Sequence, residues 1–135
     1  MAQGITDPIQ YSPLVLAYMG DAYYELFIRN MLVDQANEQV EKLHKKTISY
    51  VKASAQAAII DHYIDAEMLT EEEMAVFKRG RNTKSHTIPK NAVPSEYRKA
   101  TGFEALIGFL YLRGDTERTE ELIKAGVRFL DEKKQ

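Results

Sequence analysis

Cysteine is absent from this 135-residue chain, and so are long apolar runs. The absence of cysteine excludes disulfide bonds, thiolate metal sites and cysteine nucleophiles, and it suits a reducing environment. No apolar run approaches the roughly 20 residues of a transmembrane helix, and residues 1–10 lack the basic and apolar regions of a signal peptide. We therefore expect a cytoplasmic protein with no membrane partner.

Acidic residues are missing from one segment of a chain whose formal net charge is −2. A negative net charge is not typical of nucleic-acid-binding proteins. However, no Asp or Glu lies between Glu73 and Glu96. The basic residues of this window are Lys78, Arg79, Arg81, Lys84 and Lys90. Because a local basic stretch can hold a polyanion, the composition leaves a nucleic-acid partner open.

The alternation typical of half-buried strands is also missing, and the hydrophobic pattern is helical nearly throughout. Ser12 with Pro13 marks the start of a first helix, and Thr70 with Glu73 forms a capping box. The length and the 44% hydrophobic content fit one domain with a real core. We predict an all-α fold with a single domain over residues 1–135. The expected helices cover about 13–32, 38–51, 54–66, 71–79, 95–112 and 116–130, with a loop over 80–94, Ser95 as a cap and a frayed tail from Asp131 to Gln135.

Two carboxylates stand in unexpected surroundings. Asp21 lies in the segment 16–24 and Glu104 in the segment 101–108, and each is the only charged residue of its otherwise nonpolar segment. A buried, ionised carboxylate lowers the stability of a fold by roughly several kcal/mol unless it is paired or binds a metal. The alternative is a structural carboxylate that is hydrogen-bonded to the backbone or to an arginine.

The same two segments contain Gly20, Gly102 and Gly108. Glycine inside a helix costs about 0.5–1 kcal/mol relative to alanine, so close packing or a ligand usually explains it. A close crossing of the two helices would bring Asp21 and Glu104 together, and Mg²⁺ or Mn²⁺ would relieve their repulsion. Glu25 could join this site, but we favour an ion pair with Arg29 at the i, i+4 spacing.

These segments also resemble a known family. Leu16–Ala22, with the sequence LAYMGDA, resembles the ribonuclease III signature L-E-F-L-G-D-[AS], and FEALIG at 103–108 resembles the family's second acidic motif, D-x-x-E-A-L-I-G. The resemblance spans nearly the whole chain. The segments 43–46 and 78–82 are similar to the mini-ribonuclease III branch, a catalytic domain without a double-stranded-RNA-binding domain.

The chain departs from the family pattern at two acidic positions. Ala17 replaces the glutamate of the first motif, and Thr101 replaces the aspartate three residues before Glu104. The mini branch shares both changes, so we do not interpret them as inactivation. They bear on how firmly a second metal ion would be held.

The resemblance implies a metal-dependent endoribonuclease that cleaves double-stranded RNA. Asp21 and Glu104 would be the catalytic residues and would bind Mg²⁺, with Mn²⁺ as a substitute; the metal would activate the attacking water and stabilise the leaving oxygen. The family works as a homodimer in which each of two sites cuts one strand. Tyr18 stands where the signature phenylalanine packs at the subunit interface; the alternative is an ordinary core tyrosine.

The basic window is the expected RNA-binding segment, and a solvated loop is its alternative. The predicted phosphate contacts come from Lys78, Arg79, Arg81, Lys84, His86 and Lys90. His44 and His62 lack metal-binding spacing and are expected to be surface or packing residues. By analogy with the branch, the expected substrate is precursor large-subunit (23S) ribosomal RNA, with a ribosomal protein as a candidate partner. The competing hypothesis is a catalytically inactive ribonuclease III-like protein that binds duplex RNA or the ribosome.

Overall fold

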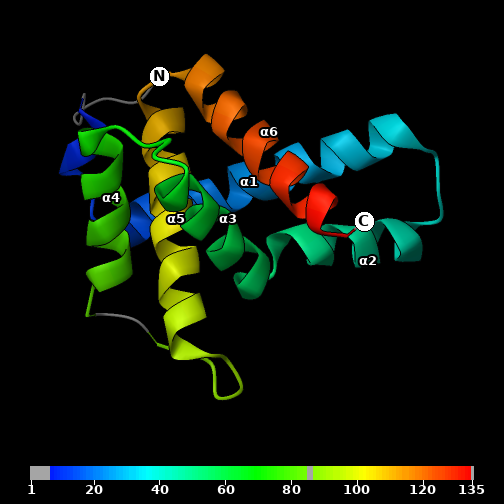
Figure 1. The fold of residues 1–135 in the computed structure, drawn as a ribbon, viewed down its shortest axis with the longest axis horizontal. Helices are drawn as coiled ribbons and strands as arrows, with labels where there is room; N and C mark the ends of the chain where they lie inside the picture. Colours follow the sequence, from blue (N-terminus) through cyan, green and yellow to red (C-terminus); the bar gives the residue numbers. More distant parts are fainter. Residues whose placement is uncertain (1–6, 85–86, 135) are drawn as a thin grey trace.

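The computed structural model describes residues 7–84 and 87–134, and these contain helices and no strand (Figure 1). The predicted all-α fold is confirmed. The elements are a 3₁₀ turn η1 (Pro8–Gln10) and the helices α1 (Pro13–Gln35), α2 (Val40–Val51), α3 (Ala53–Asp65), α4 (Glu71–Asn82), α5 (Pro94–Leu112) and α6 (Thr116–Lys133).

The predicted helix starts at Ser12 and Thr70 are confirmed. The Ser12 hydroxyl accepts a hydrogen bond from the Val15 amide at 3.2 Å, and Pro13 takes the first helical position. Thr70 and Glu73 form the complete capping box of α4. Each bond satisfies an amide that has no partner inside its helix, which is why these residue types begin helices.

Three predicted boundaries are wrong. Helix α5 begins at Pro94 with Val93 as its cap, not with Ser95, because proline needs no amide partner at the first position. Helix α4 continues through Gly80 to Asn82, where we expected a loop. The expected fraying from Asp131 is contradicted because α6 continues to Lys133 and Asp131 accepts a hydrogen bond from the Tyr50 hydroxyl.

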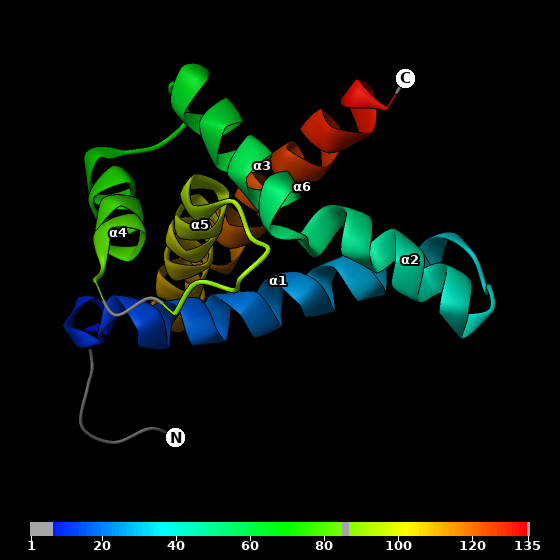
Figure 2. The same ribbon diagram turned by 90° about the horizontal axis from the view of Figure 1, so that it is seen from below.

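Helix α5 is the centre of the fold, and α1, α3, α4 and α6 all pack against it. Figure 2 shows α5 surrounded by these helices, with α1 along one side of the molecule. Every α5 side chain from Ala100 to Leu110 is buried except that of Glu104, which is partly buried. A helix buried around its whole circumference explains why this segment is apolar on all faces.

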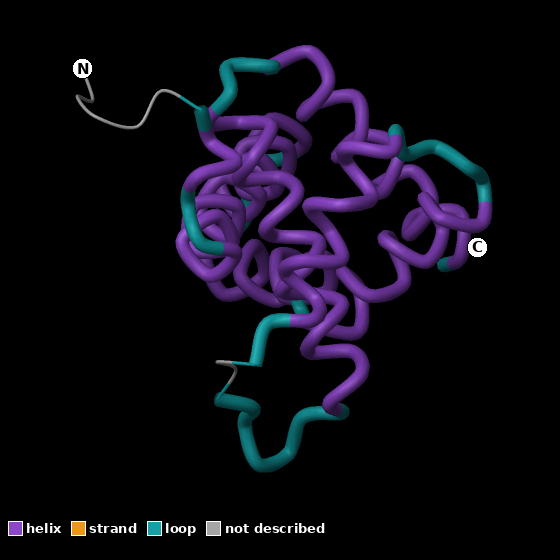
Figure 3. The backbone as a smooth tube through the Cα atoms, turned by 90° about the vertical axis from the view of Figure 1, so that its left-hand side faces the viewer, coloured by secondary structure: helices purple, strands orange, loops and turns teal. Residues whose placement is uncertain are grey.

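The described parts of the connection from α4 to α5, residues 83–84 and 87–93, extend away from the helical body at the bottom of Figure 3. Helix α2 packs instead on the C-terminal part of α1, at the right of the molecule in Figure 1, whereas α4 lies at the left. None of the described helices is long and apolar enough to cross a lipid bilayer.

Candidate active site

Helices α1 and α5 touch backbone to backbone where Gly20 faces Gly108. A Cβ atom built on Gly20 would lie 1.7 Å from the carbonyl oxygen of Glu104, and one built on Gly108 would lie 1.9 Å from the carbonyl oxygen of Leu16. Real Cβ atoms essentially never come within 3.0 Å of such atoms. Only glycine permits this separation, so the predicted close crossing of two glycine-bearing helices is confirmed here.

The third glycine of these segments serves a different contact. A Cβ on Gly102 would lie 2.6 Å from the ring of Phe77 on α4, and one on Gly80 would lie 2.9 Å from the Gly102 Cα atom. Gly80 and Gly102 therefore let α4 approach α5, while Gly20 and Gly108 let α1 approach it. Gly80 is a packing residue of a buried helix contact and does not begin a loop.

The α1–α5 crossing brings the carboxyl groups of Asp21 and Glu104 within hydrogen-bonding reach of each other. Asp21 follows Gly20 directly, and Glu104 is the residue whose carbonyl faces Gly20. The side chain of Asp21 is exposed, whereas Glu104 is partly buried. The expectation that both carboxylates lie in an apolar interior therefore applies to Glu104 and not to Asp21. The pair lies at the edge of the core, where solvent reaches one member.

The pKa of Glu104 is raised from 4.5 to about 8. Burial is the largest cause, because it penalises the charged form, and the neighbouring Asp21 carboxylate adds repulsion. A hydrogen bond from Gln56 acts in the opposite direction and favours the ionised carboxylate. At neutral pH the pair therefore retains a proton on Glu104.

Gln56, on α3, belongs to this cluster although its residue type gave no reason to choose it. Its side chain is only 1% exposed. The amide nitrogen donates to the Val51 carbonyl at 2.9 Å and to Glu104 Oε2 at 3.2 Å. One signal was present in the sequence: Gln56 is the single long polar residue in the otherwise apolar stretch from 55 to 60.

The donor atoms of the cluster suit a hard divalent cation. Asp21, Glu104 and Gln56 present only oxygen to a metal, and Mg²⁺ or Mn²⁺ prefers oxygen ligands. Within residues 7–84 and 87–134 no group of three or more His, Cys, Asp or Glu side chains could hold a metal ion. Two carboxylates fit Mg²⁺, which keeps several of its waters, and do not fit a fully protein-coordinated zinc site.

Glu25 stays outside the carboxylate pair. Its Oε2 accepts a hydrogen bond from Arg29 Nε at 2.8 Å, within the i, i+4 ion pair that we favoured. This pairing occupies the carboxylate with a local cation.

The basic residues divide between α4 and the loop. Lys78, Arg79 and Arg81 lie in the last turns of α4, where cations complement the helix dipole. Lys84 and Lys90 follow in the loop, and His86 falls outside the described residues. The loop expected from Gly80 therefore begins later than predicted, and Arg81 joins Lys78 and Arg79 on the helix.

A polar pocket of about 310 Å³ lies where α4 ends. Its lining residues are Arg81, Asn82, Thr83, Lys84 and Arg98. Arg81 is held by Asn82 Oδ1 at 2.9 Å and by the ring of Phe77. Arg98 lies on α5, beyond Glu96 in the sequence, so our basic window missed it. Folding extends the cationic surface from α4 and the loop onto the start of α5.

Tyr18 is 77% exposed, so it is not a core tyrosine. Four other large apolar side chains of α1 are also exposed, and they are Leu14 at 37%, Val15 at 44%, Leu26 at 62% and Val33 at 58%. Steps of three, four, seven or eight residues place side chains on one face of a helix, and Val15, Tyr18, Leu26 and Val33 follow such steps. Helix α1 therefore buries one face against α5 and leaves an apolar stripe uncovered, which we call the α1 stripe (Val15, Tyr18, Leu26 and Val33).

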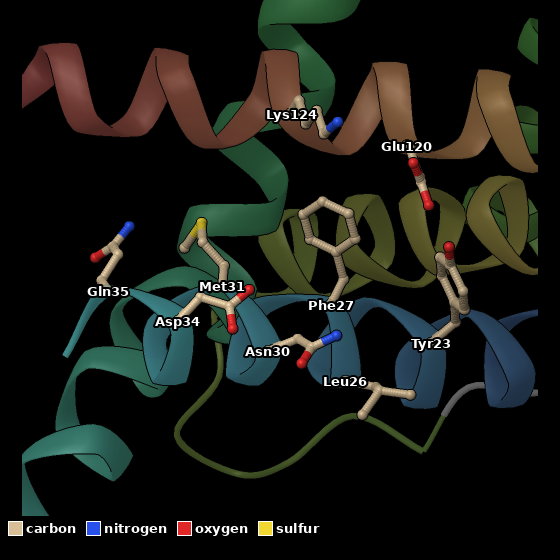
Figure 4. Close-up of a pocket in the computed structure, with 9 residues that line it drawn as sticks. All are labelled: Tyr23, Leu26, Phe27, Asn30, Met31, Asp34, Gln35, Glu120 and Lys124. Atoms are coloured by element: carbon tan, nitrogen blue, oxygen red, sulfur yellow. The ribbon is translucent and has the colours of Figure 1, made fainter. Parts of the chain in front are cut away.

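A cavity of about 490 Å³ lies between α1 and α6 (Figure 4). It is lined from α1 by residues that include Tyr23 and Phe27 and from α6 by Glu120 and Lys124. Neither Asp21 nor Glu104 lines it. This cavity is therefore separate from the carboxylate pair.

The histidines have no metal-binding arrangement among the described residues. His62 stacks on Phe129, with ring centroids 4.2 Å apart, which confirms its packing role. His44 is exposed on α2.

Comparisons with known proteins agree with these features. The ribonuclease III domain family matches residues 14–115. The chain is similar to mini-ribonuclease 3 of Symbiobacterium thermophilum (47% identity, 94% of this chain and 96% of the relative), of Clostridium tetani (52%, 93% and 83%) and of Staphylococcus aureus (42%, 90% and 91%). A crystal structure of a Fusobacterium nucleatum protein superimposes with a TM-score of 0.80 at 33% identity, covering 90% of this chain and 97% of that one. The chain therefore belongs to the ribonuclease III family, in its mini-ribonuclease 3 branch, and is an endoribonuclease.

Proposed function

We propose that the chain is an Mg²⁺-dependent endoribonuclease of double-stranded RNA whose catalytic residues are Asp21 and Glu104. The observation that carries this proposal is the pair itself: two carboxyl groups within hydrogen-bonding reach, next to a glycine-only helix crossing. Two neighbouring acids without a basic partner repel each other and lower the stability of the fold. A bound divalent cation would remove this repulsion. Residues 1–135 form one catalytic domain in this proposal.

Asp21 and Glu104 would hold the metal ion. When bound, Mg²⁺ would supply a Lewis acid for the scissile phosphate and a water of lowered pKa. Glu104 must first give up the proton that it retains at neutral pH, because ionised carboxylates are the ligands of the metal. Exposed Asp21 is already accessible to solvent and therefore to the RNA backbone.

The basic surface would hold the duplex by its phosphates. Lys78, Arg79, Arg81, Lys84 and Lys90 contribute to it, together with His86 from outside the described residues. None of the five has an ion pair with an acid in the described part of the chain. A-form RNA is recognised through its backbone and 2′-hydroxyls, so little base specificity is expected from such a surface.

The α1 stripe would form a two-fold interface between two copies of the chain. An isologous dimer needs a self-complementary surface, and one face of a single helix can meet the same face of its copy. Tyr18 is one helical turn from Asp21, so the interface would lie beside the carboxylate pair. In such a dimer two sites would flank one axis and each would cut one strand of an antiparallel duplex.

The substrate that we propose is precursor large-subunit ribosomal RNA in the cytoplasm, with a ribosomal protein as a candidate partner that presents it. The support is the likeness to proteins named mini-ribonuclease 3. This substrate rests on the family likeness alone, whereas the duplex preference also rests on the charge of the surface.

The test is cleavage of labelled duplex RNA by the purified protein with Mg²⁺ and with EDTA. The wild-type protein should cut both strands only with the metal, and Asp21→Asn should abolish cleavage while its thermal unfolding stays close to wild type. Asp34→Asn, an exposed aspartate on the same helix, is the matched control and should retain full activity. Cleavage by Asp21→Asn at the wild-type rate would overturn the assignment, as would duplex RNA that is bound but left intact.

A further inference from the structure

Gln56 has a hydrogen-bonding arrangement that packing alone does not explain. Its side chain is 1% exposed, between Ala55 and Ala57, which are also buried. Its amide nitrogen has two acceptors, Val51 O and Glu104 Oε2. Its amide oxygen is buried and has no hydrogen-bond partner among the described residues. A buried unsatisfied acceptor destabilises a fold, and an apolar side chain of similar size would remove that penalty.

We propose that Gln56 is a positioning residue that orients the Glu104 carboxylate for metal binding; the proposal rests on the function assigned to Asp21 and Glu104 above. Both neighbours of the amide nitrogen are acceptors, so the donor end of the amide must face them. The bond to the Val51 carbonyl, at the end of α2, anchors the amide at the α2–α3 corner. The bond to Glu104 then fixes one carboxylate oxygen to that anchor.

The chemistry of the site explains why an amide occupies this position. Glutamate at position 56 would add a third carboxyl group beside one whose pKa is already raised. A lysine would place a permanent positive charge where a divalent cation is expected and would compete with it. Glutamine is uncharged and donates a hydrogen bond, so it favours ionised Glu104. It adds no charge of its own, so the negative charge of the pair still attracts a metal ion.

The unpartnered amide oxygen points to the same ligand. It belongs to the same planar group as the nitrogen that lies 3.2 Å from Glu104 Oε2. Groups that orient metal ligands through hydrogen bonds typically change metal affinity by about 10- to 100-fold when they are removed. A hydrated cation at Asp21 and Glu104 would introduce hydrogen-bond donors into a site where the protein supplies an acceptor without a partner.

The test compares Gln56→Met with Tyr63→Phe. Gln56→Met keeps the size of the side chain and removes its hydrogen bonds. Tyr63→Phe removes a buried hydrogen bond to the Leu122 carbonyl from the same helix and does not touch Glu104, so it is the control for lost stability. Mn²⁺ affinity is measured by calorimetry without RNA, and kcat, KM and thermal unfolding are measured on the same preparations.

Gln56→Met should bind Mn²⁺ about 10-fold or more weakly. Its kcat at a fixed, subsaturating Mg²⁺ concentration should fall, its KM for RNA should stay near wild type, and excess metal should rescue it. Tyr63→Phe should lose thermal stability and keep its metal affinity. Wild-type Mn²⁺ affinity in Gln56→Met would overturn the proposal and leave Gln56 a structural residue. Glu104→Gln is measured alongside: if it also binds Mn²⁺ and cleaves RNA normally, the proposed site itself has failed.

Discussion

The metal-free protein should lose stability as pH rises from about 4.5 to 8, because of Glu104. The pKa of this carboxyl is 4.5 in the unfolded reference and about 8 in the folded protein. Between these values the folded state holds a proton that the unfolded state has released. Stability then falls with pH by about 1.4 kcal/mol per pH unit for one proton. Because the pKa of Glu104 is raised in the folded state, its contribution to stability is complete below pH 4.5 and is lost as pH approaches 8.

Across the whole interval, the free energy of unfolding would fall by roughly 4 to 5 kcal/mol for one group with this pKa shift. Solvent reaches part of the Glu104 side chain and screens its interactions. The lower bound that we expect for this loss of stability is therefore half of the full amplitude, about 2 kcal/mol. Either is a large fraction of the 5–15 kcal/mol typical of a domain. Other groups titrate in the same interval, so the quantity of interest is the difference from Glu104→Gln, which keeps the shape of the side chain and carries no titrating proton.

Urea unfolding at half-unit steps from pH 5 to 8.5, in EDTA, measures this difference. The wild-type protein should lose stability relative to Glu104→Gln across the interval. Asp21→Asn should show a smaller loss, because it removes the Coulombic cause and leaves the desolvation. Saturating Mg²⁺ should reduce the wild-type dependence, since a bound cation favours the ionised carboxylate. Parallel stability curves for wild type and Glu104→Gln would refute the reasoning.

Three further predictions concern the helix crossing, the dimer and the RNA surface. Gly108→Ala should destabilise the fold by about 3 kcal/mol or more in urea unfolding, because its Cβ would lie 1.9 Å from a backbone carbonyl and the helices must separate; a loss under 1 kcal/mol would contradict the tight crossing. Tyr18→Asp should shift the protein to monomers in sedimentation at micromolar concentration, and an unchanged mass would argue against the α1 stripe as the interface. Charge reversal at Lys78, Arg79 and Arg81 should weaken RNA binding. The slope of log affinity against log salt concentration should fall by about 0.9 per lost phosphate contact, a value for B-form DNA. Unchanged affinity would exclude this surface as the RNA-binding surface.

Local sequence patterns sufficed for the helices and for the approach of Asp21 to Glu104. Caps such as Ser12 and Thr70 act through residues three positions away, so their consequences can be derived without the fold. The glycines signalled close packing, because each lowers helix stability without a local benefit. They indicated the partner helix correctly for Gly20 and Gly108 but not for Gly102, which packs on Phe77 instead of completing the carboxylate crossing.

What could not be predicted depends on contacts distant in the chain. Gln56 reaches Glu104 across 48 positions, and its place in the apolar stretch 55–60 indicates burial but not which residue it contacts. Arg98 joins Arg81 and Lys84 only because α5 starts beside the end of α4. Pro89, Pro94 and several polar residues indicated a loop that begins at Gly80, yet contact with α5 holds Gly80 in a helix. In each case tertiary packing decided what the local sequence left open.

The two acids that this chain lacks are informative about the two that it keeps. Ala17 lies one turn before Asp21 and Thr101 one turn before Glu104, so both share a helix face with the pair. Both positions are buried, and the Thr101 hydroxyl donates to the Tyr97 carbonyl. Acids there would add like charge to a site that already retains a proton at neutral pH.

Restoring one acid by Thr101→Asp should therefore have opposite effects in the two states of the site. Without metal at pH 8, the variant should be about 2 kcal/mol or more less stable than wild type in urea unfolding, because a further buried carboxylate must ionise or hold a proton. With saturating Mg²⁺, much of this loss should be recovered, and Mn²⁺ should bind more tightly than to wild type, since the site offers another oxygen ligand. Thr101→Val, which keeps the shape and loses the hydroxyl, is the control for the broken hydrogen bond. Equal destabilisation of Thr101→Asp with and without metal would mean that position 101 does not face the carboxylate pair.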